Sequence, residues 1–321
     1  MAESWSGSVL VTGATGFVGR ALIEVLSKSG RRVVKGVRRK AVVDDEIAVG
    51  DIGPSTEWAA ALHGCDSVVH LAARVHVMRD TAADPLAVFR TTNTAATLNL
   101  AQQAAQAGVR RFVFVSSIKV NGEATLPGVP FTADDTPAPE DAYAVSKYEA
   151  EQGLLALATE TGMEVVIIRP PLIYGPGVKA NFQSMMRWVA KGLPLPLGAI
   201  HNRRSLVGLD NLVDLIRVCL IHPNAANQIF LVSDGEDVST TELLKRTAAA
   251  LDRTARLLPV PMWFLELGAQ ILGKGAVVKR LCGNLQVDIT KTREFLGWRP
   301  PIGLDEGLRR TAQAYLHEKA V

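Results

Sequence analysis

The chain has 321 residues, of which 48% are hydrophobic and 21% charged, and its formal net charge is +3. This length allows one large domain or two modest ones, and the composition is ordinary for an α/β enzyme. The absence of a long lysine and arginine block argues against nucleic acid as a partner. We expect no signal peptide and no integral membrane segment. The three scattered cysteines lack metal-binding or redox spacing, so we expect a cytoplasmic protein without a metal site.

Short β-rich runs alternate with helical stretches in the first half of the chain. We expect strands at 9–12, 33–37, 47–49, 67–71, 112–116 and 164–168, with helices at 19–29, 55–62, 85–107 and 143–161. The strand runs are continuously apolar, as in a parallel sheet that is covered on both faces. The order therefore predicts an α/β fold with a doubly wound parallel Rossmann sheet.

Prolines and glycines become frequent after Arg169. We expect residues 1–172 to form the dinucleotide-binding Rossmann domain. The range 205–235, with a strand at 229–232, is expected to rejoin that domain. The rest of 173–321 should form a smaller, mixed α/β substrate-binding portion.

Three glycines lie where the first strand turns into the first helix. Gly13, Gly16 and Gly19 allow a tight turn, close approach of a pyrophosphate to the backbone, and close packing of helix on strand. The free N–H groups of the helix N-terminus would face the anion. The sequence thus predicts a dinucleotide site in this turn, which also includes Thr15, Phe17 and Val18.

The end of the second strand bears on the type of dinucleotide. An acidic residue there suits the ribose of NAD, whereas a basic residue suits the 2′-phosphate of NADP. Here Arg38 and Arg39 follow the strand, so NADP(H) is favoured and NAD(H) remains possible. Asp51 and Ile52, just after the third strand, could hold the adenine.

Tyr143 and Lys147 are one turn apart on a predicted helix, so both lie on one face. An ammonium near a phenol lowers the pKa of the phenol, which would make Tyr143 an acid or base near neutral pH. Ser117, at the end of the fifth strand, could bind the substrate oxygen. The three residues predict hydride transfer between a nicotinamide and a carbinol, with proton transfer by the phenol.

Motifs along nearly the whole chain resemble the extended short-chain dehydrogenase/reductase family, in its nucleotide-sugar epimerase and 4-ketoreductase branch. They are TGATGFVG at 12–19, HLAA at 70–73, SSIKVNG at 116–122, YAVSK at 143–147, RPPLIYGPG at 169–177 and RSLVGLD at 204–210. The resemblance implies a nucleotide-sugar substrate and a homodimer that pairs through the helices at 85–107 and 143–161.

The resemblance also implies individual roles. Tyr143 would be the acid/base, Lys147 would bind the nicotinamide ribose, and Ser117 would position the reacting oxygen. Further cofactor contacts would come from Leu71, Ala72, Ala73 and Pro170. Arg204 is the expected diphosphate ligand, with Arg203 or Arg280 as helpers.

Several positions depart from the family pattern. Leu172 replaces a common asparagine, so Asn181 is a candidate for the missing polar contact, and Asn121 replaces a common tyrosine. Three polar residues near the site are further candidate substrate contacts, each equally compatible with a plain surface role: Arg74, His76 and Lys119.

The residues after Ser117 help to choose the reaction. Related 4,6-dehydratases carry an Asp-Glu pair there, whereas this chain has Ile118 and Lys119, which argues against dehydration. We expect NADPH-dependent reduction of a UDP- or dTDP-linked 4-keto-6-deoxyhexose, possibly a 2-acetamido sugar for surface polysaccharide synthesis. The alternative is a UDP-hexose or UDP-N-acetylhexosamine 4-epimerase. A non-catalytic NADP-sensing regulator is a minor alternative.

Overall fold

The computed structural model describes residues 7–39, 41–75, 84–271, 273 and 275–320. Its centre is a parallel seven-stranded sheet with the strand order β3-β2-β1-β4-β5-β6-β9. These strands are β1 (Ser8–Thr12), β2 (Val33–Val37), β3 (Glu46–Ala48), β4 (Cys65–His70), β5 (Arg111–Val115), β6 (Glu164–Arg169) and β9 (Gln228–Leu231). The chain winds outward from β1 to β3 and then returns to place β4 on the other side of β1. The doubly wound Rossmann sheet predicted from the sequence is therefore present.

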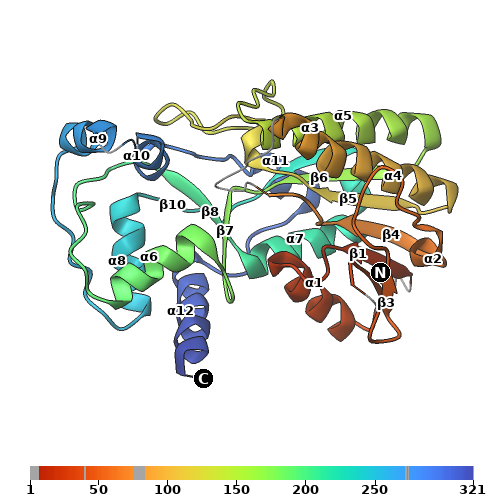
Figure 1. The fold of residues 1–321 in the computed structure, drawn as a ribbon, viewed down its shortest axis with the longest axis horizontal. Coiled ribbons are helices and arrows are strands. Elements are labelled where there is room, and N and C mark those ends of the chain that lie inside the picture. The colour runs from red at the N-terminus through yellow and green to blue at the C-terminus, as the bar shows by residue number, and fades with distance from the viewer. Residues whose placement is uncertain (1–6, 40, 76–83, 272, 274, 321) are drawn as a thin grey trace.

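Helices cover both faces of this sheet (Figure 1). On one face lie α1 (Phe17–Lys28) and α7 (Leu209–Ile221), which pack on each other. The other face carries α2 (Ala59–Leu62), α4 (Ala96–Gln106) and α5 (Ala142–Thr161). Strand residues alternate between the two apolar cores, so that Val9 and Val11 join one while Leu10 joins the other. Burial on both faces explains why the strands are continuously apolar.

A smaller part lies at one end of the large sheet (Figure 1). Its three-stranded sheet has the order β10-β8-β7, formed by β7 (Leu172–Tyr174), β8 (Arg204–Gly208) and β10 (Asp237–Val238). Its third core involves α6 (Ala180–Ala190), α8 (Thr240–Ala250) and α12 (Leu304–Ala320). The remaining helices are α9 (Met262–Ile271), α10 (Gly275–Cys282) and α11 (Thr290–Leu296). The range 205–235 contributes β9 and α7 to the large sheet, while β8 at its start belongs to the small one.

Two helices differ from the sequence prediction. The stretch 85–107 is one helical rod, but a π-helical segment η1 (Arg90–Ala95) separates α3 (Pro85–Phe89) from α4. π-Helical turns are rare and tend to mark functional sites, and a hydrophobic pattern does not reveal them. The helix predicted at 55–62 begins only at Ala59, because Thr56 instead folds back onto Gly53 and Asp51.

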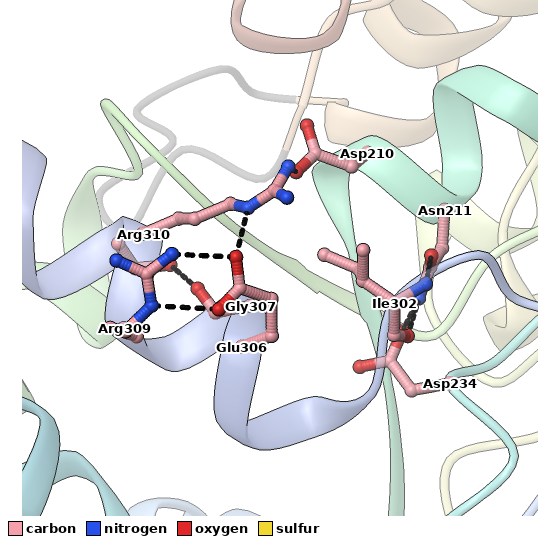
Figure 2. Close-up of polar contacts among 9 residues, drawn as sticks. Asp210, Asn211, Asp234, Ile302, Glu306, Gly307, Arg309 and Arg310 are labelled. Atoms are coloured by element: carbon pink, nitrogen blue, oxygen red, sulfur yellow. Dashed lines mark hydrogen bonds and ion pairs between the residues drawn. The ribbon is translucent and has the colours of Figure 1, made fainter.

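Polar contacts attach the C-terminal helix to the large-sheet part (Figure 2). The amide nitrogen of Asn211 donates to the carbonyl of Ile302 at 2.9 Å, and the Asn211 oxygen accepts the Ile302 N–H at 3.1 Å. Near the surface, Arg310 pairs with Asp210 and Glu306, both at 2.7 Å. The buried amide contact fixes the start of α12, whereas exposed ion pairs of this kind contribute about 1 kcal/mol or less.

No helix among the described residues is long and apolar enough to cross a membrane. Cys65, Cys219 and Cys282 are all buried and unpaired. No cluster of side chains suited to a metal ion occurs in the described part of the chain.

Candidate active site

The glycine turn between β1 and α1 has the geometry of a pyrophosphate cradle. Gly13 has a φ of +66°, and a Cβ there would lie 2.8 Å from the Ala72 nitrogen. A Cβ on Gly19 would lie 2.2 Å from the Gly13 oxygen. No side chain caps the start of α1 at Gly16, and its first turn has no acidic residue. An anion can therefore come close to the backbone N–H groups, and residues 13–19 fit a dinucleotide pyrophosphate.

This turn lies at the topological switch point of the sheet. The chain leaves β1 toward β2, and β4 returns on the other side of β1. Leu71, Ala72 and Ala73 follow β4 directly, and the Ala72 N–H donates to the Thr12 hydroxyl at 3.3 Å. The predicted cofactor residues of these two segments are thus adjacent, in the crevice where ligands of such folds bind.

The two arginines after β2 have different surroundings. Arg39 makes paired hydrogen bonds to Glu46, at 2.9 and 2.7 Å, and the Glu46 side chain is only 8% exposed. Arg38 is largely exposed and pairs with the equally exposed Asp51 at 3.0 Å. Ile52 packs at the edge of the adjacent core. Arg38 is therefore the more accessible of the two for a phosphate.

Ser117, Tyr143 and Lys147 meet beyond the end of β5. Ser117 precedes the short helix η2 (Ile118–Val120), and its hydroxyl hydrogen-bonds the Tyr143 phenol. Pro170, after β6, accepts the Ile118 N–H at 3.0 Å and so holds this turn. The Phe89 ring packs edge-on against Tyr143 with centroids 6.0 Å apart. Three elements therefore fix the phenol beside the serine.

Lys147 is 2% exposed, and its ammonium donates to the Val115 carbonyl at 2.9 Å. It also lies 4.3 Å from the centre of the Phe114 ring. Burial lowers the pKa of Lys147 to about 7, although Glu151 opposes that shift. A lysine that is half neutral near pH 7 can take part in proton transfer.

The expected lowering of the Tyr143 pKa by Lys147 is not found. Burial, and to a lesser extent the charge of Asp141, raises the pKa of Tyr143 to about 12, against the opposing effect of the hydrogen bond from Ser117. The ammonium of Lys147 is engaged by Val115 and Phe114 instead of the phenol. The charge balance around Asp141 therefore matters for the chemistry of Tyr143.

A buried hydrogen-bond chain lies beneath the cofactor turn. The Thr97 hydroxyl donates to the Asn93 carbonyl at 2.7 Å, so its oxygen accepts from Nε2 of His70 at 2.9 Å. Nδ1 of His70 then accepts from Thr12 at 2.7 Å. Burial, followed by the charge of Lys147, lowers the pKa of His70 to about 3. The chain is thus neutral, with one defined histidine tautomer.

Asn93, in the π-helical segment, joins this chain to the catalytic helix. Its side chain exchanges two hydrogen bonds with the Arg74 backbone, at 2.8 and 3.1 Å, and donates to the Ser146 hydroxyl at 3.1 Å. Ser146 in turn donates to the Tyr143 carbonyl at 2.7 Å. Sequence reasoning missed both Asn93 and His70, although a polar residue within an apolar strand or helix face was a usable signal.

Lys119 lies between two carboxylates beside Ser117. Its ammonium is 2.6 Å from Glu123 and 2.6 Å from Asp141. Asp141 caps α5 by accepting the Ala144 N–H at 2.7 Å. Asn121, flagged as unusual in the sequence, accepts from the buried Arg169 at 2.9 Å. Arg169 also pairs with the buried Glu151 at 2.5 Å, behind the catalytic helix.

The predicted substrate residues are spread more widely. Arg204, at the start of β8, donates to the Gly283 carbonyl at 3.0 Å, and burial lowers its pKa. Asn181 is exposed at the start of α6, and Leu172 is 45% exposed in β7. Arg280 lies in α10, with its side chain outside the described structure, and His76 lies outside the described residues altogether. Arg74 follows the alanine pair and stacks 5.7 Å from the centre of Phe89.

Comparisons with known proteins agree with this geometry. Residues 9–233 match the NAD dependent epimerase/dehydratase family. A Vibrio cholerae protein named UDP-glucose 4-epimerase is 55% identical over 96% of this chain and 95% of its own length.

Solved structures of similar proteins share the fold. The structure of MoeE5 in complex with UDP-glucuronic acid and NAD has a TM-score of 0.76 at 27% identity, covering 98% of this chain and all of MoeE5 (100%). The UDP-glucose 4-epimerase of Thermotoga maritima, solved with UDP-glucose, has a TM-score of 0.75 over 98% of this chain and 100% of its own. At 22% identity it supports the fold alone. The chain is therefore an enzyme of the NAD dependent epimerase/dehydratase family, the extended short-chain dehydrogenase/reductases.

Proposed function

We propose that the protein is a 4-epimerase of UDP-linked hexoses or N-acetylhexosamines. One observation carries this proposal: a relative named UDP-glucose 4-epimerase matches nearly the whole chain at 55% identity. Ser117 and Tyr143, with Lys147 one turn along α5, lie at the same carboxyl edge of the parallel sheet as the glycine turn and supply groups that the reaction needs. The comparisons favour the epimerase, the alternative raised in the sequence analysis, over the reductase expected first.

The side chains have distinct roles in this reaction. A bound nicotinamide dinucleotide supplies the hydride acceptor and donor, and residues 13–19 with 71–73 would hold it. Tyr143 takes the proton of the sugar C4 hydroxyl and later returns it, while Ser117 holds the same oxygen. Lys147, one turn along α5 with its buried ammonium donating to the Val115 carbonyl, would bind the nicotinamide ribose. Arg204 would bind the diphosphate, so that the hexose can turn and expose its other face.

The test uses purified protein and UDP-glucose, followed by proton NMR at C4 with no reductant added. We expect conversion to UDP-galactose, and UDP-N-acetylglucosamine is tested in parallel. Tyr143→Phe should slow the reaction about 10²- to 10⁴-fold, because it removes the acid/base hydroxyl. Tyr148→Phe is the matched control, since Tyr148 lies on the same helix and bonds only Gln152 within the described hydrogen bonds. No epimer with any UDP-sugar would refute the proposal.

The second candidate is NADPH-dependent reduction of a nucleotide-linked 4-keto-6-deoxyhexose. It is favoured by the exposed Arg38, which could bind a 2′-phosphate in place of its surface partner Asp51. NADPH consumption with a UDP-linked 4-keto sugar would support it. Arg38→Ala should then weaken NADPH binding about tenfold while leaving NADH binding unchanged.

We also propose a homodimer built on the helical rod 85–106 and α5, in a cytoplasmic protein. The surface ion pair of Arg90 with Glu149, at 2.6 Å, links these helices within one chain. Three buried, unpaired cysteines fit a reducing compartment. Light scattering of the purified protein tests the dimer.

A further inference from the structure

Lys119 joins the two segments that carry the catalytic hydroxyls. The Ser117 oxygen accepts the Lys119 N–H at 3.3 Å, so the lysine belongs to the serine turn. Its side chain crosses to Asp141, the N-cap of the helix that carries Tyr143. The side chains of Lys119, Glu123 and Asp141 are 26%, 24% and 27% exposed. The cluster is therefore partly shielded, and its charges act more strongly than charges at an open surface.

The two carboxylates have different positions. Asp141 uses Oδ1 to cap α5 at Ala144 and Oδ2 to pair with Lys119. It lies close enough to Tyr143 for its charge to disfavour the phenolate. Glu123 lies four residues after Lys119 and pairs with it outside the helix that carries Tyr143. Only the Asp141 side of the cluster thus bears on the catalytic phenol.

The other groups around Tyr143 are uncharged or have partners of their own, so the balance of charge next to the phenol depends on Lys119 and Asp141. Ser117 contributes a hydrogen bond and Phe89 an apolar ring. The guanidinium of Arg74 lies over that ring, and Lys147, one turn along α5, donates to Val115. Among the described residues, Asp141 is the carboxylate whose charge raises the pKa of the Tyr143 phenol.

We propose that Lys119 is a positioning residue, which holds the Ser117 turn against the start of α5 and screens the charge of Asp141 from the Tyr143 hydroxyl. This role rests on the proposed function of Tyr143 as the acid/base. It replaces the substrate contact expected for Lys119 from the sequence, because both partners of its ammonium belong to the protein.

The decisive variants change charge while keeping shape. Lys119→Met removes the ammonium and retains an aliphatic side chain, so Asp141 loses this ion-pair partner. Asp141→Asn removes the carboxylate charge and retains an oxygen that can cap α5. The double variant removes both charges. Lys119→Arg keeps the charge, and Glu123→Gln removes only the carboxylate that does not act on Tyr143.

The first measurement does not depend on activity. The protein has four tyrosines, so labelling with fluorotyrosine gives four ¹⁹F signals, and Tyr143→Phe identifies the signal of Tyr143. We expect Lys119→Met to move its titration to higher pH by about half a unit to one unit, as one partly screened charge would. Asp141→Asn should move it lower, and the double variant, which lacks both charges, should titrate between the two single variants. Lys119→Arg and Glu123→Gln should titrate like the wild type.

The second measurement is kcat/KM for the sugar substrate as a function of pH. Below the pKa of the base, a shift of half a unit to one unit slows proton abstraction about threefold to tenfold at fixed pH. Lys119→Met should show this loss, and Asp141→Asn in the Lys119→Met background should reverse it. A loss confined to KM, with unchanged titration of Tyr143, would return Lys119 to a substrate contact and overturn the proposal.

The two proposals fail separately. If the titration shifts as expected but no nucleotide-sugar is converted, the role of Lys119 stands and the epimerase proposal falls. If Lys119→Met does not fold, Asp141→Asn with Glu123→Gln as its control decides the question. Equal titration of Tyr143 in those two variants would overturn the role of Lys119.

Discussion

Two of the buried polar networks in this protein differ in charge. Beneath the cofactor turn, Thr12, His70, Thr97 and Asn93 form a neutral chain. Between the two sheets, the Asp234 carboxylate accepts from the Tyr174 hydroxyl, the Gly208 N–H and the Asn211 amide, each at 2.7 Å. The first network shapes a binding turn, whereas the second attaches the small sheet and α12 to the large one.

The difference suggests how each network is used. A neutral chain with one tautomer keeps the turn rigid and adds no charge near an anionic pyrophosphate. A buried carboxylate is stable only while its donors remain in place, so it couples distant segments strongly. Here those segments are β7, β8, α7 and, through Asn211, the start of α12.

The largest expected effect is on Asp234. Asp234→Ala leaves the Tyr174, Gly208 and Asn211 donors without their acceptor, which should lower the free energy of unfolding by about 3 kcal/mol. Urea denaturation measures this change. Asp234→Asn keeps one acceptor oxygen and should cost less. A loss below about 1 kcal/mol for Asp234→Ala would show that the charged network is not the stronger tie.

Next comes the response of His70 to acid. Its pKa falls from 6.5 to about 3 on folding, so the unfolded chain takes up a proton that the native chain refuses. Above pH 6.5 the imidazole is neutral in both states, so protonation of His70 does not affect stability. As the pH falls from 6.5 toward 3, the free energy of unfolding decreases by about 1.4 kcal/mol per pH unit. Urea titrations at pH 7 and pH 5 should therefore differ by about 2 kcal/mol more in the wild type than in His70→Gln. Parallel losses in both proteins would contradict a neutral, buried histidine.

Thr97→Val should have a smaller effect. It removes the acceptor for His70 and the donor to the Asn93 carbonyl in a fully buried position. Unsatisfied groups of this kind cost about 1 to 2 kcal/mol. Thermal unfolding tests this, with Thr159→Val on the exposed part of α5 as control, which we expect to change little. Equal effects at the two sites would remove the case for a connected chain.

The smallest expected effect distinguishes the network that shapes the active site from the network that joins the two sheets. Asn93→Ala frees the Arg74 backbone and Ser146, so it should lower kcat/KM about tenfold, which corresponds to about 1.4 kcal/mol. Tyr174→Phe lies in the other network and should change kcat/KM less than twofold in the folded enzyme. Steady-state kinetics on both variants measures the difference. If Tyr174→Phe impairs turnover as much as Asn93→Ala, the two networks are not functionally separate.

The sequence predicted the large sheet well, because buried parallel strands are continuously apolar and the glycine turn has a local signature. It also predicted cofactor segments at 13–19 and 71–73, and these two segments lie together at the switch point of the sheet. The π-helical segment at 90–95 was not predicted, because hydrophobic periodicity indicates a continuous helix over 85–107 and does not reveal a local change of helix type. The role of Asn93 depends on that segment.

Charge interactions were harder to predict than positions. Lys147 was expected to lower the Tyr143 pKa, but the ammonium points to Val115, and burial with Asp141 raises that pKa instead. Arg38 and Arg39 look equivalent in sequence, yet Arg39 is held by a carboxylate that is almost buried. Such outcomes depend on which side chains meet across different elements, and no local pattern encodes them.

By itself, the sequence determined the doubly wound sheet, the glycine turn and the spacing of Tyr143 and Lys147 on one helix face. These follow from hydrophobic periodicity and from the conformational freedom of glycine, which act over a few residues. Only the tertiary structure decided the partners of Lys119, the tautomer of His70 and the attachment of α12 through Asn211 and Asp234. Those depend on burial and on charges brought together from distant segments, because both arise only when the chain is folded.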